Sequence, residues 1–269
     1  MQISCAHRDL AARKRRRLGW AALFLAILCA LAWQLSRTRE PVYQGKPLSA
    51  WLRYYALGAD PREALKANQA VREIGTNAIP TLLRMLQRKD SALKVKLLAL
   101  GQRQLFVRIP YVAAVDRKVE AIQAFGVLGS SARSAVPELV QLYEQSIPGD
   151  PQSQWQAVAA LSCIGPAAED AIPSFLRDAT NADRLVRADA IVALGMLHIA
   201  PGLVVPALVE ALRDPDDLVR IAAAESLGQF GGLAKPALPA LTELLQAENQ
   251  ELRDKAENTL KKIAPDAVK

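Results

Sequence analysis

Apolar residues recur along this chain in columns spaced 33 residues apart. One column holds Ala157, Ala190, Ala223 and Ala256, a second holds Leu161, Leu194, Leu227 and Leu260, and a third holds Ile164, Leu197, Phe230 and Ile263. A fixed period of this length is typical of stacked helical hairpins, in which each hairpin buries its apolar face against its neighbours. The pattern therefore predicts an all-α protein built as an α-solenoid.

Glycine and proline mark the turn inside each predicted hairpin. Glycine tolerates the left-handed conformation that ends a helix, and proline lacks an amide hydrogen that a first helical turn leaves unpaired. We expect the first helices to end at Gly129, Gly165, His198 and Gly231, and the second helices to open at Pro137, Pro173, Pro206 and Pro239. An earlier unit has a shorter turn, from Gly75 to Pro80, and residues 251–263 supply a single helix that closes the stack.

These units resemble HEAT repeats in the short-period form common in bacteria and shared with bilin lyase-like repeats. The resemblance spans about residues 67–264 and implies a fold used by scaffolds, adaptors, inhibitors and some enzymes. A further column fits it: Asp183, Asp216 and Asn249 are each followed four residues later by Arg187, Arg220 or Arg253. In HEAT families such columns bond between neighbouring repeats, so we interpret these arginines as structural.

The segment 43–52 is similar to the lead-in that precedes the repeats of many membrane-attached bacterial HEAT proteins. It implies a helix over residues 48–57, with Trp51 and Tyr55 packed on the first repeat to cover the end of the stack. An alternative interpretation makes Trp51, Tyr54 and Tyr55 a ligand site, although aromatic residues at helical spacing are more often core.

The N-terminal region carries the signal for location. Residues 18–36 form an uncharged run of 19 residues, which as a helix extends about 28 Å and matches a bilayer core. A basic tail, residues 1–17, precedes it. The positive-inside rule then keeps this tail in the cytoplasm and exports the linker 37–66 and the repeats 67–269.

We therefore expect a single-pass protein of the bacterial inner membrane whose repeats are periplasmic or extracytoplasmic. A cleaved signal peptide is the rival interpretation, because a basic head and an apolar stretch precede Ala30-Leu31-Ala32. Both interpretations export the repeats.

The three cysteines predict an exported domain without an internal disulfide. Cys5 falls in the tail, Cys29 in the apolar run and Cys163 alone in the repeats. Because its column neighbours are Val127, Met196 and Gln229, we expect Cys163 to be a buried or half-buried small hydrophobe.

Charge changes sign along the repeats. Residues 41–134 hold 15 Lys or Arg against 6 Asp or Glu, whereas residues 135–269 hold 11 against 19. Much of the positive charge falls near an irregular insertion at about residues 91–117, where the repeat is interrupted. The candidate binding residues of the basic stretch 84–118, which contains this insertion, are Arg84, Arg88, Lys94, Lys96, Arg103 and Arg108.

Basic residues that interleave with apolar ones suit an amphipathic segment on lipid headgroups or on an acidic partner. A solvated basic helix face is the alternative interpretation. Nucleic acid is not an expected partner of an exported domain with no further basic surface.

A solenoid usually lines its concave groove with its second helices. Counting four residues past each opening proline gives a column of polar residues, which we call the second-helix column: Arg84, Gln141, Arg177, Glu210 and Glu243. We predict that an unknown protein partner docks on this column, although solvated polar side chains are the default at such positions.

The sequence offers little for catalysis. His7 and His198 lack a cysteine or a second histidine at metal-ligand spacing, and phosphate-loop, dinucleotide and nucleophile-elbow motifs are missing. We therefore expect no cofactor, no metal and no enzyme activity. The function predicted from the sequence is a membrane-anchored scaffold or adaptor for protein–protein interaction. The alternative is a bilin lyase-like enzyme or enzyme accessory with a pocket near His198 and Cys163.

Overall fold

A computed structural model describes residues 40–55, 60–87, 114–146 and 151–265 of the chain. The predicted tail 1–17 and the apolar run 18–36 lie outside these ranges, as does most of the predicted insertion. Among the helices that the structure describes, none is both long enough and apolar enough to cross a bilayer.

The lead-in is a small hairpin followed by a short helix. Strands β1 (Val42–Tyr43) and β2 (Lys46–Pro47) pair antiparallel, with Tyr43 opposite Lys46. Gln44 and Gly45 between them both have positive φ angles, as a two-residue hairpin turn requires. The predicted helix 48–57 is shorter than expected, because α2 (Leu48–Leu52) gives way to the 3-10 helix η1 (Arg53–Tyr55).

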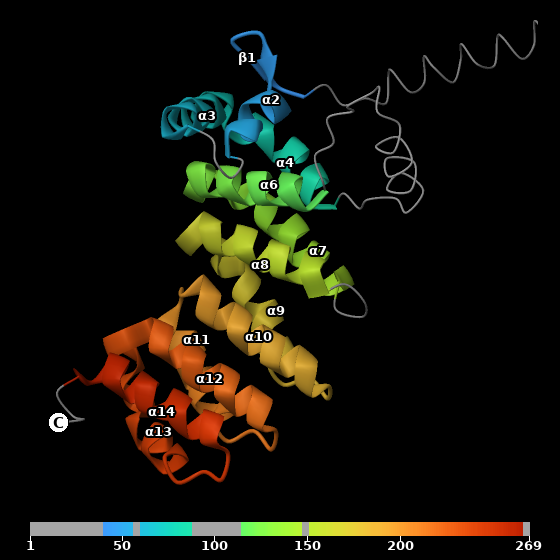
Figure 1. Cartoon of the computed structure of the whole chain (residues 1–269). Coiled ribbons are helices and arrows are strands. Elements are labelled where there is room, and N and C mark those ends of the chain that lie inside the picture. The colour runs from blue at the N-terminus through green and yellow to red at the C-terminus, as the bar shows by residue number, and fades with distance from the viewer. Residues whose placement is uncertain (1–39, 56–59, 88–113, 147–150, 266–269) are drawn as a thin grey trace, which may run out of the picture. The chain divides into compact units, whose positions relative to one another are not determined.

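The repeats are helical hairpins that follow one another along the chain, as predicted (Figure 1). Their first helices are α3 (Pro61–Ile74), α6 (Ala114–Leu128), α8 (Pro151–Ile164), α10 (Arg184–Leu197) and α12 (Asp217–Phe230). Their second helices are α4 (Ile79–Gln87), α7 (Val136–Ser146), α9 (Ile172–Asp178), α11 (Pro201–Ala211) and α13 (Leu238–Leu244). The single helix α14 (Gln250–Ile263) follows the last hairpin and packs on both α12 and α13.

Two boundaries differ from the sequence prediction. The first hairpin begins at Pro61 rather than at residue 67, because Asp60 accepts a hydrogen bond from the Arg62 N–H and caps α3. Residues 114–117, the end of the predicted insertion, already belong to α6.

The columns spaced 33 residues apart form the core. All four alanines and all four leucines of the first two columns are buried, from Ala157 and Leu161 on α8 to Ala256 and Leu260 on α14. The third column, from Ile164 to Ile263, is buried as well. Because each first helix presents this apolar face to the next hairpin, the core runs continuously through the repeats.

Glycines end the first helices as predicted. Gly75, Gly129, Gly165 and Gly231 all have positive φ angles, and each opens a short 3-10 helix that leads to the second helix. These 3-10 helices are η2 (Gly75–Ala78), η3 (Gly129–Ala135), η4 (Gly165–Ala171) and η5 (Gly231–Ala237). Pro80, Pro137, Pro173 and Pro239 then occupy the second position of their helices.

The hairpin of α10 and α11 departs from this plan, and the prediction for Pro206 is wrong. His198 ends α10 in the left-handed conformation, Ala200 is left-handed too, and Pro201 opens α11 at once. Pro206 therefore lies inside α11. The helix tolerates it because Gly202, four residues earlier, is exposed, so water can bond the carbonyl that loses its amide partner.

Small residues bring neighbouring first helices close together. A Cβ atom added to Gly195 on α10 would lie 2.5 Å from the Ser226 hydroxyl oxygen and 2.9 Å from the Ser226 Cα on α12. The Ser226 hydroxyl donates to the Ile191 carbonyl at 3.0 Å. Thr259 on α14 repeats this bond to Ala224 at 2.9 Å, so the close approach and its hydrogen bond recur along the stack.

This close approach predicts that Gly195→Ala destabilises the fold. Overpacking of this kind costs about 1 to 3 kcal/mol, because the added methyl would meet backbone as well as side-chain atoms of Ser226. Gly202→Ala is the matched control, since nothing lies within 4 Å of its added Cβ. Thermal unfolding followed by circular dichroism should show a lower midpoint for Gly195→Ala only. Equal midpoints for the two variants would contradict the packing argument.

Candidate functional site

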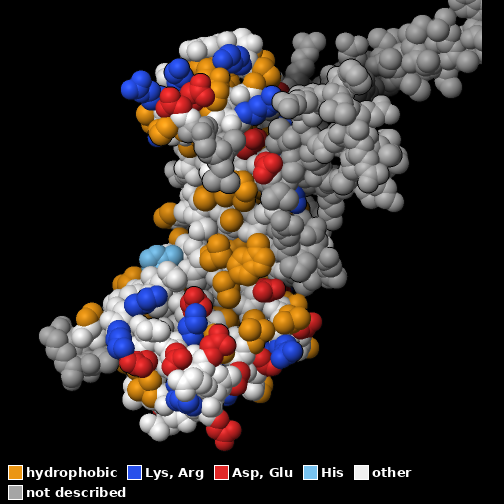
Figure 2. Space-filling view, viewed as in Figure 1, with side chains coloured by type: hydrophobic (Ala, Val, Ile, Leu, Met, Phe, Trp, Pro, Cys, Tyr) orange, Lys and Arg blue, Asp and Glu red, His pale blue; other side chains and the backbone are white. Residues whose placement is uncertain are grey.

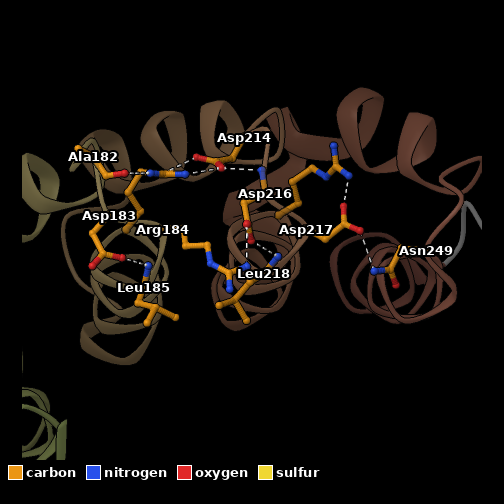
Figure 3. Close-up of polar contacts among 11 residues, drawn as sticks. Ala182, Asp183, Arg184, Leu185, Asp214, Asp216, Asp217, Leu218 and Asn249 are labelled. Atoms are coloured by element: carbon orange, nitrogen blue, oxygen red, sulfur yellow. Dashed lines mark hydrogen bonds and ion pairs between the residues drawn. The ribbon is translucent and has the colours of Figure 1, made fainter.

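The loops between hairpins carry a ladder of polar residues, shown in Figure 3. Asp183, Asp216 and Asn249 each precede a first helix and accept a hydrogen bond from a backbone N–H in its first turn. The donors are Leu185 at 2.8 Å, Leu218 at 3.0 Å and Leu252 at 3.2 Å. The column predicted from the sequence is thus a column of helix N-caps.

Ion pairs and a hydrogen bond from a side-chain amide link the loops of neighbouring repeats. Arg187 on α10 donates to both carboxylate oxygens of Asp214, at 2.8 and 2.9 Å, and both side chains are largely buried. Arg184 reaches Asp216 at 3.0 Å, and Asn249 donates to Asp217 at 2.8 Å (Figure 3). Bonding between neighbouring repeats is therefore seen for Arg187, Asp216 and Asn249, whereas Arg220 and Arg253 bond within their own helix or loop. The partners Arg184, Asp214 and Asp217 were missed, because they stand outside the predicted column.

The arginines of the ladder are committed to the protein itself. Arg187 also donates to the carbonyls of Asn181 and Ala182, and Arg220 pairs with Asp217. Arg253 donates to the carbonyl of Glu248 at 2.8 Å. With their donors directed at these groups, the arginines hold the loops in place, in agreement with the structural interpretation.

The second-helix column is exposed along its length, from Arg84 on α4 to Glu243 on α13. Its members differ in how tightly the protein holds them. Arg177 donates to Glu144 on the preceding repeat at 2.9 Å, and Arg84 donates to the Pro80 carbonyl at 3.1 Å. Among the described residues, the side chains of Gln141 and Glu243 make no hydrogen bond. Docking of a partner on this column stays a prediction.

The remaining candidate residues of the basic stretch 84–118 fall outside the described part of the chain. They are Arg88, Lys94, Lys96, Arg103 and Arg108.

A buried polar cluster was missed by the sequence analysis. Tyr143 on α7, Gln154 on α8 and Asp178 on α9 are each at least nine-tenths buried. Burial and the nearby Asp178 carboxylate raise the pKa of Tyr143 above its usual range. Its aromatic ring packs edge-on against Phe175 at 4.6 Å. Only the packing of three helices brings these side chains together, since their spacing follows no periodic column.

Tyr55 of the lead-in packs on the first repeat, as the sequence predicted, whereas the contacts of Trp51 lie within the lead-in. Trp51 is buried and its ring nitrogen donates to the Tyr43 carbonyl at 3.1 Å. The Tyr55 hydroxyl donates to Asn68 on α3 at 2.7 Å. Lys46 already lies over the Trp51 ring, 4.9 Å from its centroid. These contacts favour the packing interpretation over a ligand site.

The pocket suggested near His198 and Cys163 exists in part. A cavity of about 510 Å³ lies between α10 and α12, with His198 in its wall. Cys163 is not among the residues that line this cavity, and the prediction that it is buried or half-buried is wrong. It is exposed on α8, beside Gly126 of α6, because its column lies on the outer side of the first helices. Neighbouring protein shields the thiol enough to raise its pKa.

The buried ion pair of the ladder predicts a pH-dependent stability. The Arg187 guanidinium and the Asp216 N–H hold the pKa of Asp214 below its usual range. A carboxyl with a lowered pKa stabilises the fold above its unfolded-state pKa, and this stabilisation disappears as the pH falls through the folded-state pKa. At pH 7, Asp214→Asn should lower the free energy of unfolding by about 2 to 3 kcal/mol. The difference from the unsubstituted chain should shrink in acid.

Urea unfolding at a series of pH values measures this effect. Asp170→Asn is the control, because its ion pair with Arg133 joins two exposed side chains and such pairs contribute little. A pH-independent difference for Asp214→Asn would contradict the assignment.

Comparison with known proteins identifies part of the chain. None of the curated proteins matches it. Human deoxyhypusine hydroxylase in complex with glycerol is 18% identical, covering 80% of this chain and 95% of that one, with a TM-score of 0.39. A designed armadillo repeat protein in complex with peptide (KR)4 is 16% identical, covering 81% and 100%, with a TM-score of 0.39. An engineered protein is 20% identical, covering 82% and 99%, with a TM-score of 0.38. Likenesses this weak transfer no function.

The model of the HEAT repeats family matches residues 174–261, from α9 to α14. This segment contains the N-cap ladder and the middle part of the columns spaced 33 residues apart. The HEAT resemblance seen in the sequence is thus confirmed for residues 174–261, and the helical hairpins before them repeat the same plan.

Proposed function

We propose that this chain is a non-catalytic HEAT-repeat scaffold that binds a protein partner on its second-helix column. One observation supports the proposal above the others: the column stays exposed on every hairpin, although the repeats share one buried core. The side chains of Gln141 and Glu243 are exposed to solvent, whereas the arginines of the ladder donate hydrogen bonds to groups of the loops. A rigid row of exposed polar side chains is what an adaptor offers to a partner.

The change in charge along the second-helix column favours one orientation of the partner. The column is basic at its N-terminal end, at Arg84, and acidic at its C-terminal end, at Glu210 and Glu243. Arg213 pairs with Glu210 at 3.3 Å, but both side chains remain more than half exposed, so this pair competes weakly with a ligand. A partner with an acidic end and a basic end would dock in one direction only.

We further propose that residues 18–36 anchor the scaffold in the bacterial inner membrane, with the N-terminus cytoplasmic and the repeats outside the cytoplasm. Support comes from the sequence, through the length of the apolar run and the basic tail before it. We propose lipid headgroups as a second partner of the basic insertion, because lysine and arginine are attracted to anionic lipid.

Crosslinking in intact cells tests the docking surface. We expect Gln141→Lys to reduce crosslinking to the partner about tenfold or more, because the interface would bury an unpaired ammonium group. Gln123→Lys is the matched control: the same residue type, also exposed, but on the first helix α6 of the same hairpin. Crosslinked proteins are identified by mass spectrometry. Equal yields for the two variants would sink the second-helix column as the docking surface.

Cysteine labelling tests the topology. Because Cys163 is exposed on α8, a membrane-impermeant maleimide should modify it in intact spheroplasts, and Cys163→Ser should abolish the signal. Cys5 should react only after lysis. The thiolate is the reactive form, so the raised pKa of Cys163 predicts faster labelling as the pH increases. Labelling of Cys163 only after lysis would place the repeats in the cytoplasm.

A further inference from the structure

The cavity between α10 and α12 has one apolar and one polar wall. Val192 and Met196 of α10 form the apolar side, and Gly195 lines the cavity between them. Glu225, Ser226 and Gln229 line the cavity from α12, and His198 from the end of α10. A volume of about 510 Å³ falls within the range of about 300 to 1,000 Å³ that is common for ligand sites.

The backbone beside this cavity is strained. His198 has φ 50° and Ala200 has φ 48°, a left-handed conformation that is unfavourable for residues with a Cβ atom. In the other described hairpins, glycine ends the first helix. Strained residues of this kind gather at functional sites, where the surrounding structure holds them. The His198 ring packs edge-on against Phe230 at 4.8 Å, which fixes it beside the cavity.

Apolar side chains surround the same edge of the stack. Met196 is 38% exposed, Leu203 on α11 is 59% exposed and Leu233 in η5 is 60% exposed. The elements that carry Leu203 and Leu233 pack against each other. Figure 2 shows the histidine at one edge of the molecule with orange apolar side chains close by. An apolar ligand group would gain contact area here by leaving water.

The polar wall offers both kinds of hydrogen bond. The Gln229 amide makes no hydrogen bond within the described residues, and an amide can pair with a peptide backbone as donor and acceptor. The Ser226 hydroxyl is spent on the Ile191 carbonyl. Glu225 pairs through one carboxylate oxygen with Lys255 at 2.8 Å, and its side chain is 54% exposed, so its other oxygen can accept from a cation.

We propose that this cavity, the α10–α12 site, binds an extended peptide segment of a partner protein that carries an apolar residue followed by a cationic one. The apolar side chain would lie against Val192 and Met196, the backbone would bond Gln229 and the cation would face Glu225. The excess of acidic over basic residues in 135–269 also favours a positively charged ligand. The site rests on the proposed scaffold function but lies on first helices, away from the second-helix column.

The methionines of the chain allow a direct test. The chain has three, and two lie in the described repeats: Met196 in the cavity wall and Met85, buried on α4. The full chain with ¹³C-methyl methionine, in detergent micelles, is titrated with acetyl-Gly-Leu-Lys-Gly-amide and followed by NMR. We expect a saturable shift of the Met196 methyl signal and none of Met85.

Two further peptides check the chemistry. Replacing leucine by serine should remove the Met196 shift, because the apolar anchor is lost. Replacing lysine by glutamate should weaken binding about threefold, the size expected for an exposed charge pair. No saturable Met196 shift with the Leu-Lys peptide, or equal shifts with the serine peptide, would overturn the proposal.

Variants locate the binding. Gln229→Trp should fill the cavity from an exposed position of α12 and abolish the Met196 shift, whereas Gln123→Trp on α6 should leave it intact. His198→Gly provides a variant that folds, because glycine suits the left-handed turn. It should raise the thermal midpoint yet weaken peptide binding several-fold. Unchanged binding in both Gln229→Trp and His198→Gly would refute the site.

The peptide titration can fail without the crosslinking experiment failing, so the α10–α12 site and the proposed function are tested separately. Crosslinking on the second-helix column depends on Gln141 and should be unaffected by Gln229→Trp.

Discussion

The close stacking of first helices is the constraint on which the rest of this structure depends. Alanines such as Ala190 and Ala223 fill the contacts fully, and Gly195 meets Ser226 with no space for a methyl group. Hydroxyls of Ser226 and Thr259 bond carbonyls of the preceding first helix, so the approach is set by polar as well as apolar contacts. Once these helices are in register, the loops and the second helices have little freedom left.

The two edges of the stack use that register differently. At the edge where first helices begin, Asp183 and Asp216 cap α10 and α12, and the largely buried pair of Arg187 with Asp214 ties one loop to the next repeat. At the edge where first helices end, glycine turns dominate, except that His198 and Ala200 take a left-handed conformation that is unfavourable for residues with a Cβ atom. The edge where first helices begin stabilises the fold, whereas the edge where they end holds a cavity and exposed apolar side chains. A scaffold of this kind can carry binding surfaces without weakening its own core.

Charge and exposure divide the molecule's surface into regions of different use. The ladder arginines bond carbonyls and carboxylates of their own loops and helices, so their number says little about ligands. The second-helix column has fewer internal commitments and changes sign along the repeats. Polar residues that the fold does not need are the ones available to a partner.

The sequence by itself determined the period, the buried columns and the glycine turns, because each depends on local conformation or on one face of one helix. Tertiary structure decided the rest. Cys163 is exposed because its column faces outward. Pro206 is internal to α11 because no 3-10 helix follows α10 and Pro201 opens the second helix at once. The partners Arg184, Asp214 and Asp217, the cluster around Tyr143 and the α10–α12 cavity arise between elements. Their geometry depends on how helices cross, and no single helix encodes it.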